Sequence, residues 1–190
     1  MKIETVKLWA ETLCLATIER ECKGDNIIDK HFGYTENELI SDSDLINRCS
    51  GKNGLGVERE GNKNTASAFI ISRADAMETI RSVLMDEYTM KTICKWSNDC
   101  ARGEDLILEF DFDEVIGKAF TQATWHEWNA GAAHCSSIRI ILGKDEWTEK
   151  YHPERNFYIK SLYPFMNEED MEEIQNRSIA YNASLKFEVA

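Results

Sequence analysis

The stretch NFYIKSLYP, residues 156–164, decides the fold of this 190-residue chain. This stretch is expected to be a strand that Pro164 ends. In LILEFDF (106–112) apolar and polar residues alternate, which is typical of a strand with one buried face, and SIRIIL (137–142) is expected to be another strand. VIGKAF (115–120) follows the first of these after a two-residue turn, which favours a hairpin. We therefore expect an antiparallel sheet in the second half of the chain.

The first half carries apolar residues at helical spacing instead. Thr35 and Glu38 fit a capping box that would open one helix, whereas the glycine- and asparagine-rich residues 50–65 indicate an exposed loop. Residues 185–189 are a candidate last strand. Helices that precede the strands indicate an α+β protein with an antiparallel sheet. Helices are expected over residues 3–22, 39–49, 72–88, 90–96 and 168–177.

The composition narrows the class of protein. The chain carries 34 Asp and Glu against 22 Lys and Arg, a formal net charge of −12. Broad affinity for nucleic acid needs clustered basic residues, so RNA could bind only in a small basic cleft, while an acidic face suits a basic protein partner. No linker divides the sequence, so we expect one domain over residues 1–190. No secretory signal or membrane span is evident, so we expect a cytoplasmic location and no membrane partner.

Two residue types could carry chemistry or metal binding. The six cysteines are scattered without C-x-x-C spacing, which predicts reduced, mostly buried thiols. His126 and His134 lie eight apart in a tryptophan-rich stretch with no evident third ligand, so no metal is expected. His31 differs because Lys30 precedes it and Phe32-Gly33 follows, and glycine permits a positive φ or a close backbone approach. A histidine titrates near neutrality and suits proton transfer, although a structural role is the plainer interpretation.

A series of segments resembles one known family. HFGYTENEL, residues 31–39, resembles the H-V-G-K-T-x-x-x-L segment of the bacterial ribonuclease-A-like toxin domain, found at the C-terminus of contact-dependent growth-inhibition proteins. Together the similar segments span about residues 17–165, which leaves residues 166–190 as a C-terminal extension. In chain order the further segments are ASAF (66–69) with the helix over 74–84, Trp96, VIGK (115–118), IRIIL (138–142) and FYIKSLYP (157–164).

The resemblance implies a pancreatic-ribonuclease-like fold and a metal-independent endoribonuclease without a cofactor. Such a hydrolase would be a bacterial toxin or effector that cleaves RNA, with tRNA among the candidates, and leaves DNA intact. A cognate immunity or inhibitor protein is the implied partner, and a target-cell cytoplasm is the implied place of action. The catalytic residues carried over from the family's motif are His31, Ser161 and Tyr163, with Arg48 taken for the family's arginine. Lys30, Lys118 and Trp125 would contact the RNA.

These residues can be given roles in cleavage by the 2′-hydroxyl of RNA. That reaction needs a base near the hydroxyl, a proton donor for the leaving oxygen, and charge stabilisation at phosphorus. His31 would be the base or acid, and Arg48 with Lys118 would hold the phosphate. Ser161 and Tyr163 share a strand face because they are two residues apart. His152 is a loose candidate for the second proton carrier.

Two departures from the family pattern keep alternatives open. Ser161 replaces a threonine but retains the hydroxyl, whereas the arginine expected about eleven residues after His31 is Asp42, with Arg48 the nearest arginine. If Asp42 takes that place, the chain is an inactive member of the fold that acts as an acidic protein-binding module. An unrelated enzyme, such as an ADP-ribosyltransferase, would rely on the acidic row at residues 109, 111 and 113, which a solvated strand explains better.

Overall fold

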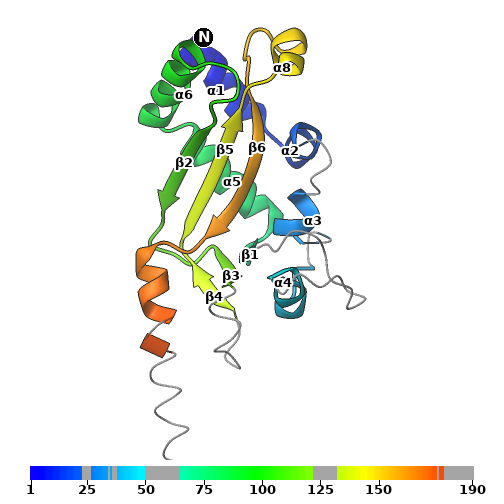
Figure 1. The fold of residues 1–190 in the computed structure, drawn as a ribbon, viewed down its shortest axis with the longest axis vertical. Coiled ribbons are helices and arrows are strands. Elements are labelled where there is room, and N and C mark those ends of the chain that lie inside the picture. The colour runs from blue at the N-terminus through cyan, green and yellow to red at the C-terminus, as the bar shows by residue number, and fades with distance from the viewer. Residues whose placement is uncertain are drawn as a thin grey trace, which may run out of the picture.

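The computed structural model describes residues 1–22, 27–33, 35, 38–49, 65–121, 132–174 and 176–177. This described part of the chain forms two three-stranded antiparallel sheets with helices packed around them, which makes it an α+β fold (Figure 1). The expectations for residues 50–64, for Trp125 and His126, and for the strand at 185–189 lie outside the described residues.

The N-terminal segment forms two helices where the sequence pattern predicts one. Helix α1 (Ile3–Thr12) buries Val6, Trp9 and Ala10, and α2 (Leu15–Glu21) follows at once. Leu13 and Cys14 between them have extended backbone conformations. Leu13 is 1% exposed, so this extended residue keeps its side chain in the core while the helix axis changes direction. The predicted single helix over residues 3–22 is therefore wrong at this point.

Helices α3 (Ile27–His31) and α4 (Asp42–Cys49) lie beside the small sheet. The predicted capping box at Thr35 and Glu38 is wrong, because α4 begins further along the chain. Ser41 Oγ accepts the N–H of Asp44 at 3.2 Å, and an Asp44 oxygen accepts the N–H of Ser41 at 3.4 Å. Ile40 and Leu45 are buried in one cluster, so a hydrophobic staple supports this cap.

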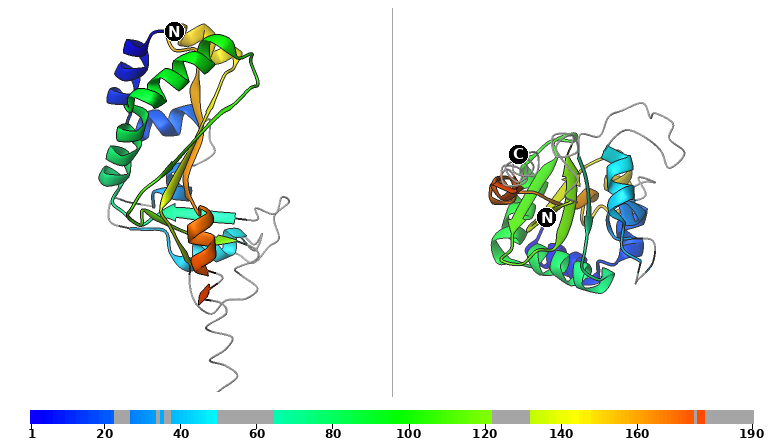
Figure 2. Two further views of the ribbon diagram at one scale, coloured as in Figure 1. Left: turned by 90° about the vertical axis from the view of Figure 1, so that its left-hand side faces the viewer. Right: turned by 90° about the horizontal axis from the view of Figure 1, so that it is seen from below.

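The large sheet has the order β2 (Leu106–Asp111), β5 (Ser137–Gly143), β6 (Tyr158–Phe165). Helices α1, α5 (Arg73–Leu84) and α6 (Glu87–Asp99) cover one of its faces (Figure 2). The helical stripe predicted on α5 is buried there. The boundary at residue 88 was wrong, since the Asp86 carboxylate caps α6 by accepting the N–H of Thr89.

The last strand runs through Pro164 rather than ending before it. Pro164 pairs with Ile138 in the register of β5 and β6, and β6 lies at the edge of the described strands, where a missing N–H is tolerated. The register shifts between Ile141, opposite Ser161, and Leu142, opposite Ile159, which leaves Lys160 as the extra residue of a bulge. Beyond the bulge, Leu162 and Pro164 are buried while Tyr163 and Phe165 are half-buried, so the two aromatic residues belong to the strand face opposite the core.

The small sheet has the order β1 (Thr65–Phe69), β3 (Gly117–Thr121), β4 (Ala133–Cys135). The predicted hairpin is wrong, because β3 pairs with β1 and β4 and not with β2. The chain crosses between sheets where Ile116 N–H donates to Cys135 O at 2.9 Å. A Cβ at Gly117 would lie 2.5 Å from Pro164 Cβ, so glycine lets β3 approach the end of β6.

The remaining elements complete the surface. Helix α8 (Glu146–Tyr151) lies at one end of the large sheet, and residues 168–174 form a helical segment at the other (Figure 1). All six cysteines lie within the described residues and are thiols, four of them buried. Among the described residues, no helix combines the length and apolar content that a membrane crossing requires.

Candidate functional site

The candidate site lies where the two sheets meet, around His31. The Nδ1 atom of His31 is 2.7 Å from the carbonyl oxygen of Ser67 on β1. The imidazole also stacks on the ring of Tyr163 on β6, with centroids 5.6 Å apart and planes inclined by 28°. The structure therefore brings together two of the residues that the sequence singled out, although about 130 residues separate them in the chain.

The contact with Ser67 determines which nitrogen of His31 carries the proton in the neutral ring. A carbonyl oxygen only accepts hydrogen bonds, so Nδ1 must carry a proton in this contact. In the neutral ring Nε2 then holds the lone pair, and in the charged ring it holds the transferable proton. The Ser67 carbonyl therefore orients the imidazole as a proton acceptor or donor at Nε2.

Residues that follow His31 hold it in place. Phe32 is 1% exposed, and its ring centroid lies 4.8 Å from that of Phe69. Gly33 has φ +90°, and a side chain there would collide with the carbonyl of Glu38, which confirms the prediction of a positive φ or close approach. Arg73, the first residue of α5, donates to the Gly33 carbonyl. A buried aromatic pair and a tight turn thus anchor the end of α3.

Arg48 lies against the backbone just before His31. Its Nη1 donates to Lys30 O at 2.6 Å and its Nη2 to Asp29 O at 3.2 Å. These carbonyls belong to the last turn of α3, so the guanidinium caps the C-terminal end of that helix. Arg48 is therefore adjacent to the His31 segment, with two of its N–H groups committed to the backbone.

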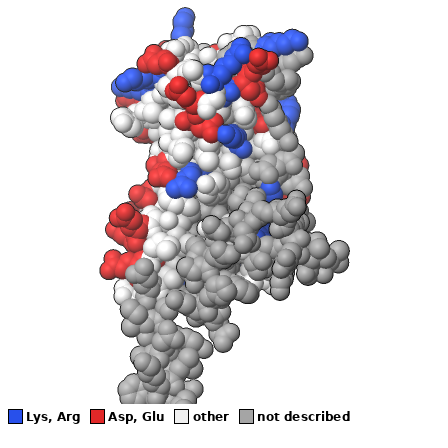
Figure 3. Space-filling view, viewed as in Figure 1, with Lys and Arg blue, Asp and Glu red and all other residues white. Residues whose placement is uncertain are grey.

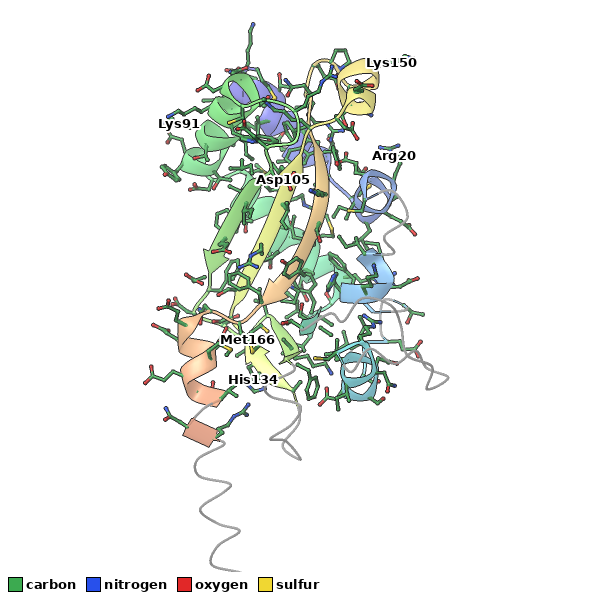
Figure 4. The ribbon with its side chains drawn as sticks, in the orientation of Figure 1. Arg20, Lys91, Asp105, His134, Lys150 and Met166 are labelled. Carbon is green, nitrogen blue, oxygen red and sulfur yellow. The ribbon has the colours of Figure 1, made fainter. Side chains whose placement is uncertain are left out.

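Asp42 contacts the small sheet instead. One carboxylate oxygen lies 2.6 Å from Lys118 Nζ on β3, and the other accepts the N–H of Ala132 at 3.4 Å. Burial of Asp42 alone would raise its pKa, but the hydrogen bond and charge of Lys118 outweigh burial and lower that pKa. His134 is the register partner of Lys118 on the neighbouring strand and is exposed (Figure 4). Asp42 thus offsets the charge of a lysine assigned to RNA contact.

Arg139 is a candidate functional residue that the sequence reasoning missed. In the sheet register it stands between Glu109 on β2 and Tyr163 on β6. Its Nη1 donates to the Tyr163 hydroxyl at 3.3 Å, and its Nε donates to Glu109 Oε1 at 2.6 Å. The guanidinium carbon also lies 4.5 Å from the ring centroid of Phe165. A row of contacts therefore runs across the open face from Glu109 to Tyr163 and on to His31.

The other predicted residues are placed as follows. Ser161 is half-buried on β6, two residues before Tyr163 and on the same face, and Lys30 is half-buried beside His31. His152 follows α8, with Nδ1 3.6 Å from Glu154, at the end of the large sheet remote from α3 (Figure 1). His152 therefore does not lie beside His31. The prediction that it is the second proton carrier is wrong for this reason.

Comparisons with known proteins bear on the fold. No protein family matches the chain in a scan, and no curated protein matches its sequence. Among solved structures, a chain from the crystal structure of the CdiA-CT/CdiI complex from Y. kristensenii 33638 is similar, with TM-score 0.50 and 19% sequence identity. The alignment covers 74% of this chain and 98% of that chain. The likeness shows a shared α+β fold.

Proposed function

We propose that the protein is a metal-independent endoribonuclease that acts as a toxin or effector and has a cognate immunity protein. The observation that carries the proposal is the setting of His31, whose Nδ1 faces the Ser67 carbonyl while its ring stacks on Tyr163. The fold shared with a chain of a CdiA-CT/CdiI complex supports the toxin and the partner. A pancreatic-ribonuclease-like architecture and delivery into a target-cell cytoplasm are parts of the same proposal.

In this mechanism His31 handles the proton of the attacking group. Nε2 would accept the proton of the RNA 2′-hydroxyl, which then attacks the adjacent phosphorus as a 2′,3′-cyclic phosphate forms. The P–O5′ bond breaks, and the leaving 5′-oxygen takes a proton from water to become a hydroxyl. The Ser67 carbonyl favours the proton transfer to Nε2 because it stabilises the imidazolium that results. Ser161 and Tyr163 would donate hydrogen bonds to phosphate oxygens, since both side chains belong to one face of β6.

Arg139 strengthens the case for Tyr163 as a donor. The phenol oxygen accepts from Arg139 Nη1, so its own proton is available for an acceptor such as phosphate. The guanidinium adds positive charge beside the position where phosphorane charge would develop. Arg48 remains the second source of positive charge, at the backbone of Lys30. Arg139 thus supplies on β5 a charge that the family pattern places on a helix.

One observation favours the alternative of an inactive, protein-binding member of the fold. Lys118, assigned to phosphate contact, is paired with Asp42, and its side chain is only 19% exposed. A lysine held by a carboxylate contributes little attraction to a phosphate. If the positive charge near His31 is too low to bind RNA, the same surface would serve only protein recognition. A measurement of RNA cleavage distinguishes the two functions.

The test is cleavage of a labelled tRNA and of total RNA by the purified protein in EDTA. We expect 2′,3′-cyclic phosphate ends, no cleavage of DNA, and a loss of at least about 10²-fold in rate for His31→Ala, because general base catalysis contributes about that factor. His152→Ala is the matched control, since His152 is also half-buried but lies at the other end of the sheet. It should retain the wild-type rate.

Two results would count against the enzyme. Wild-type protein that leaves both RNA preparations intact would support the inactive, protein-binding alternative. Equal losses in His31→Ala and His152→Ala would point to a general effect of removing an imidazole rather than to the site. Cleavage that EDTA abolishes would overturn the metal-independent mechanism while leaving the nuclease in place.

A further inference from the structure

A groove of about 450 Å³ opens beside the end of β6, and His31 is not among its lining residues. Its apolar lining comes from Phe165, Met166 and Met171, all half-buried, and Figure 4 shows Met166 between β6 and the helical segment 168–174. Carboxylates of the large sheet and of that helical segment surround these side chains. The carboxylates are Glu109, Asp111, Glu168 and Glu172.

A network of hydrogen bonds connects residues at the border of the groove. Asn167 Oδ1 accepts the N–H of Asp170 at 2.9 Å, and an Asp170 oxygen accepts the N–H of Asn167 at 3.1 Å, so the two residues form a reciprocal helix cap. Asp170 also accepts from the Ser136 hydroxyl at 3.0 Å, and Asn167 Nδ2 donates to Asp111 at 3.2 Å. The first turn of the helical segment is therefore fastened to the ends of β2 and β5.

The charged side chains that line the groove are all acidic, although Arg139 pairs with one of them, Glu109. None of its lining residues is a lysine or an arginine. Hydrogen bonds from Ser137 and then from Asn167 hold the pKa of Asp111 below its usual range, so this carboxylate keeps its charge. Within the described part of the chain, Glu168 and Glu172 form no ion pair, and both are exposed. Figure 3 shows acidic side chains gathered along this edge of the molecule.

We propose that this groove is a docking site for a basic, amphipathic segment of a partner protein, with Lys or Arg side chains flanking aliphatic ones. Aliphatic side chains would enter between Phe165 and the two methionines, whose flexible thioethers adapt to irregular apolar shapes. Basic side chains would meet the surrounding carboxylates, which would steer the encounter and set the register. RNA is excluded as the occupant because its phosphates would face the same carboxylates.

One residue connects the groove with the candidate site. Glu109 lines the groove and also holds Arg139, which contacts Tyr163. A basic side chain of the partner that pairs with Glu109 would compete with Arg139 for that carboxylate. A partner bound in the groove would thus change the contacts of Arg139 with Glu109 and Tyr163 without covering His31. The docking itself does not depend on ribonuclease activity.

The test uses a fluorescent twelve-residue peptide of lysine and leucine, titrated into the full chain by anisotropy. Glu168→Lys with Glu172→Lys should weaken binding by at least about tenfold, because both changes place like charge against the peptide. The matched control is Glu87→Lys with Glu146→Lys, which changes the net charge equally on exposed residues of α6 and α8. The control should bind within about twofold of wild type.

Methionine-methyl NMR locates the bound peptide. We expect shifts of Met166 and Met171 on titration, with Met77 in the core and Met90 on α6 unchanged. Equal weakening in the two double variants, or shifts at Met90 without shifts in the groove, would overturn the proposal. Self-association of the chain that the groove variant abolishes would make a second copy the occupant instead, and Met166 shifts with an RNA oligonucleotide would contradict the exclusion of RNA.

Discussion

Strand β6 has a glutamate–arginine pair near each end, and the two pairs differ in burial. At the first end, Arg155 Nη1 lies 2.5 Å from Glu21, and the side chains are 6% and 2% exposed. At the other end, Arg139 Nη2 lies 2.5 Å from Glu109, and the side chains are 33% and 48% exposed. The groups and the separation are the same, so any difference in role comes from the surroundings.

The buried pair joins elements. The second oxygen of Glu21 accepts the N–H of Ile159 at 2.9 Å, and the Arg155 guanidinium lies 5.7 Å from the ring centroid of Trp9. Helix α2, helix α1 and β6 therefore share one desolvated charge pair. The open pair instead leaves Arg139 in contact with solvent and with Tyr163. Burial makes the first pair a structural fastening, while exposure leaves the second able to meet a ligand.

The largest effect should come from breaking the buried pair. Glu21→Ala leaves Arg155 charged and desolvated without its partner and removes the acceptor for Ile159 N–H. We expect the free energy of unfolding to fall by about 3–5 kcal/mol. Urea denaturation followed by tryptophan fluorescence measures it. Removing both partners in Glu21→Ala with Arg155→Ala should cost less than the sum of the single changes.

The matched control is Glu109→Ala in the exposed pair. An ion pair in contact with water contributes about 0–1 kcal/mol, so this variant should unfold at nearly the wild-type urea concentration. Comparable destabilisation of Glu21→Ala and Glu109→Ala would mean that burial does not separate the two pairs. That result would remove the basis for treating Arg139 as a functional residue rather than a structural one.

Strand positions could be predicted from the sequence better than strand partners. The sequence pattern predicts three strands near residues 106–112, 137–142 and 156–163, close to β2, β5 and β6. The hairpin with residues 115–120 was wrong because pairing depends on how the chain crosses between sheets at Ile116 and Cys135. Strand β1 has small residues that carry little alternation, and only its partner β3 makes it a strand.

The site shows the same limit. The family resemblance predicts that His31 and Tyr163 belong to one site. The structure shows that their rings stack. Arg139 was missed because its meaning depends on register across three strands, which places it between Glu109 and Tyr163. One signal was available, since a single arginine interrupts an apolar strand. Spacing along the chain is the only sequence information on Arg48 and Asp42, whereas their contacts depend on where α4 begins.

The next largest effect should come from removing Arg139, the arginine of the exposed pair. Arg139→Ala should lower kcat/KM for RNA by about 10²-fold, the usual effect of losing one preorganised donor at a charged transition state. Its unfolding free energy should change by less than about 1 kcal/mol, as expected for an exposed pair. Arg102→Ala is the matched control, since Arg102 forms an exposed pair with Glu146 near α8. A similar loss of kcat/KM in both variants would contradict a specific role for Arg139.

The smallest effect concerns a third pair of intermediate burial, Asp42 with Lys118, whose side chains are 46% and 19% exposed. Lys118 lowers the pKa of Asp42 in the folded chain, against the opposing effect of burial. The ionised carboxylate therefore adds stability above its unfolded pKa of about 3.9, and this stability disappears as the pH falls through the lower folded value. Asp42→Asn should flatten that acid dependence by less than about 1 kcal/mol, because solvent screens the pair. Urea unfolding between about pH 2 and 6 measures it, and an unchanged acid slope in Asp42→Asn would show that the pair behaves like a fully exposed one.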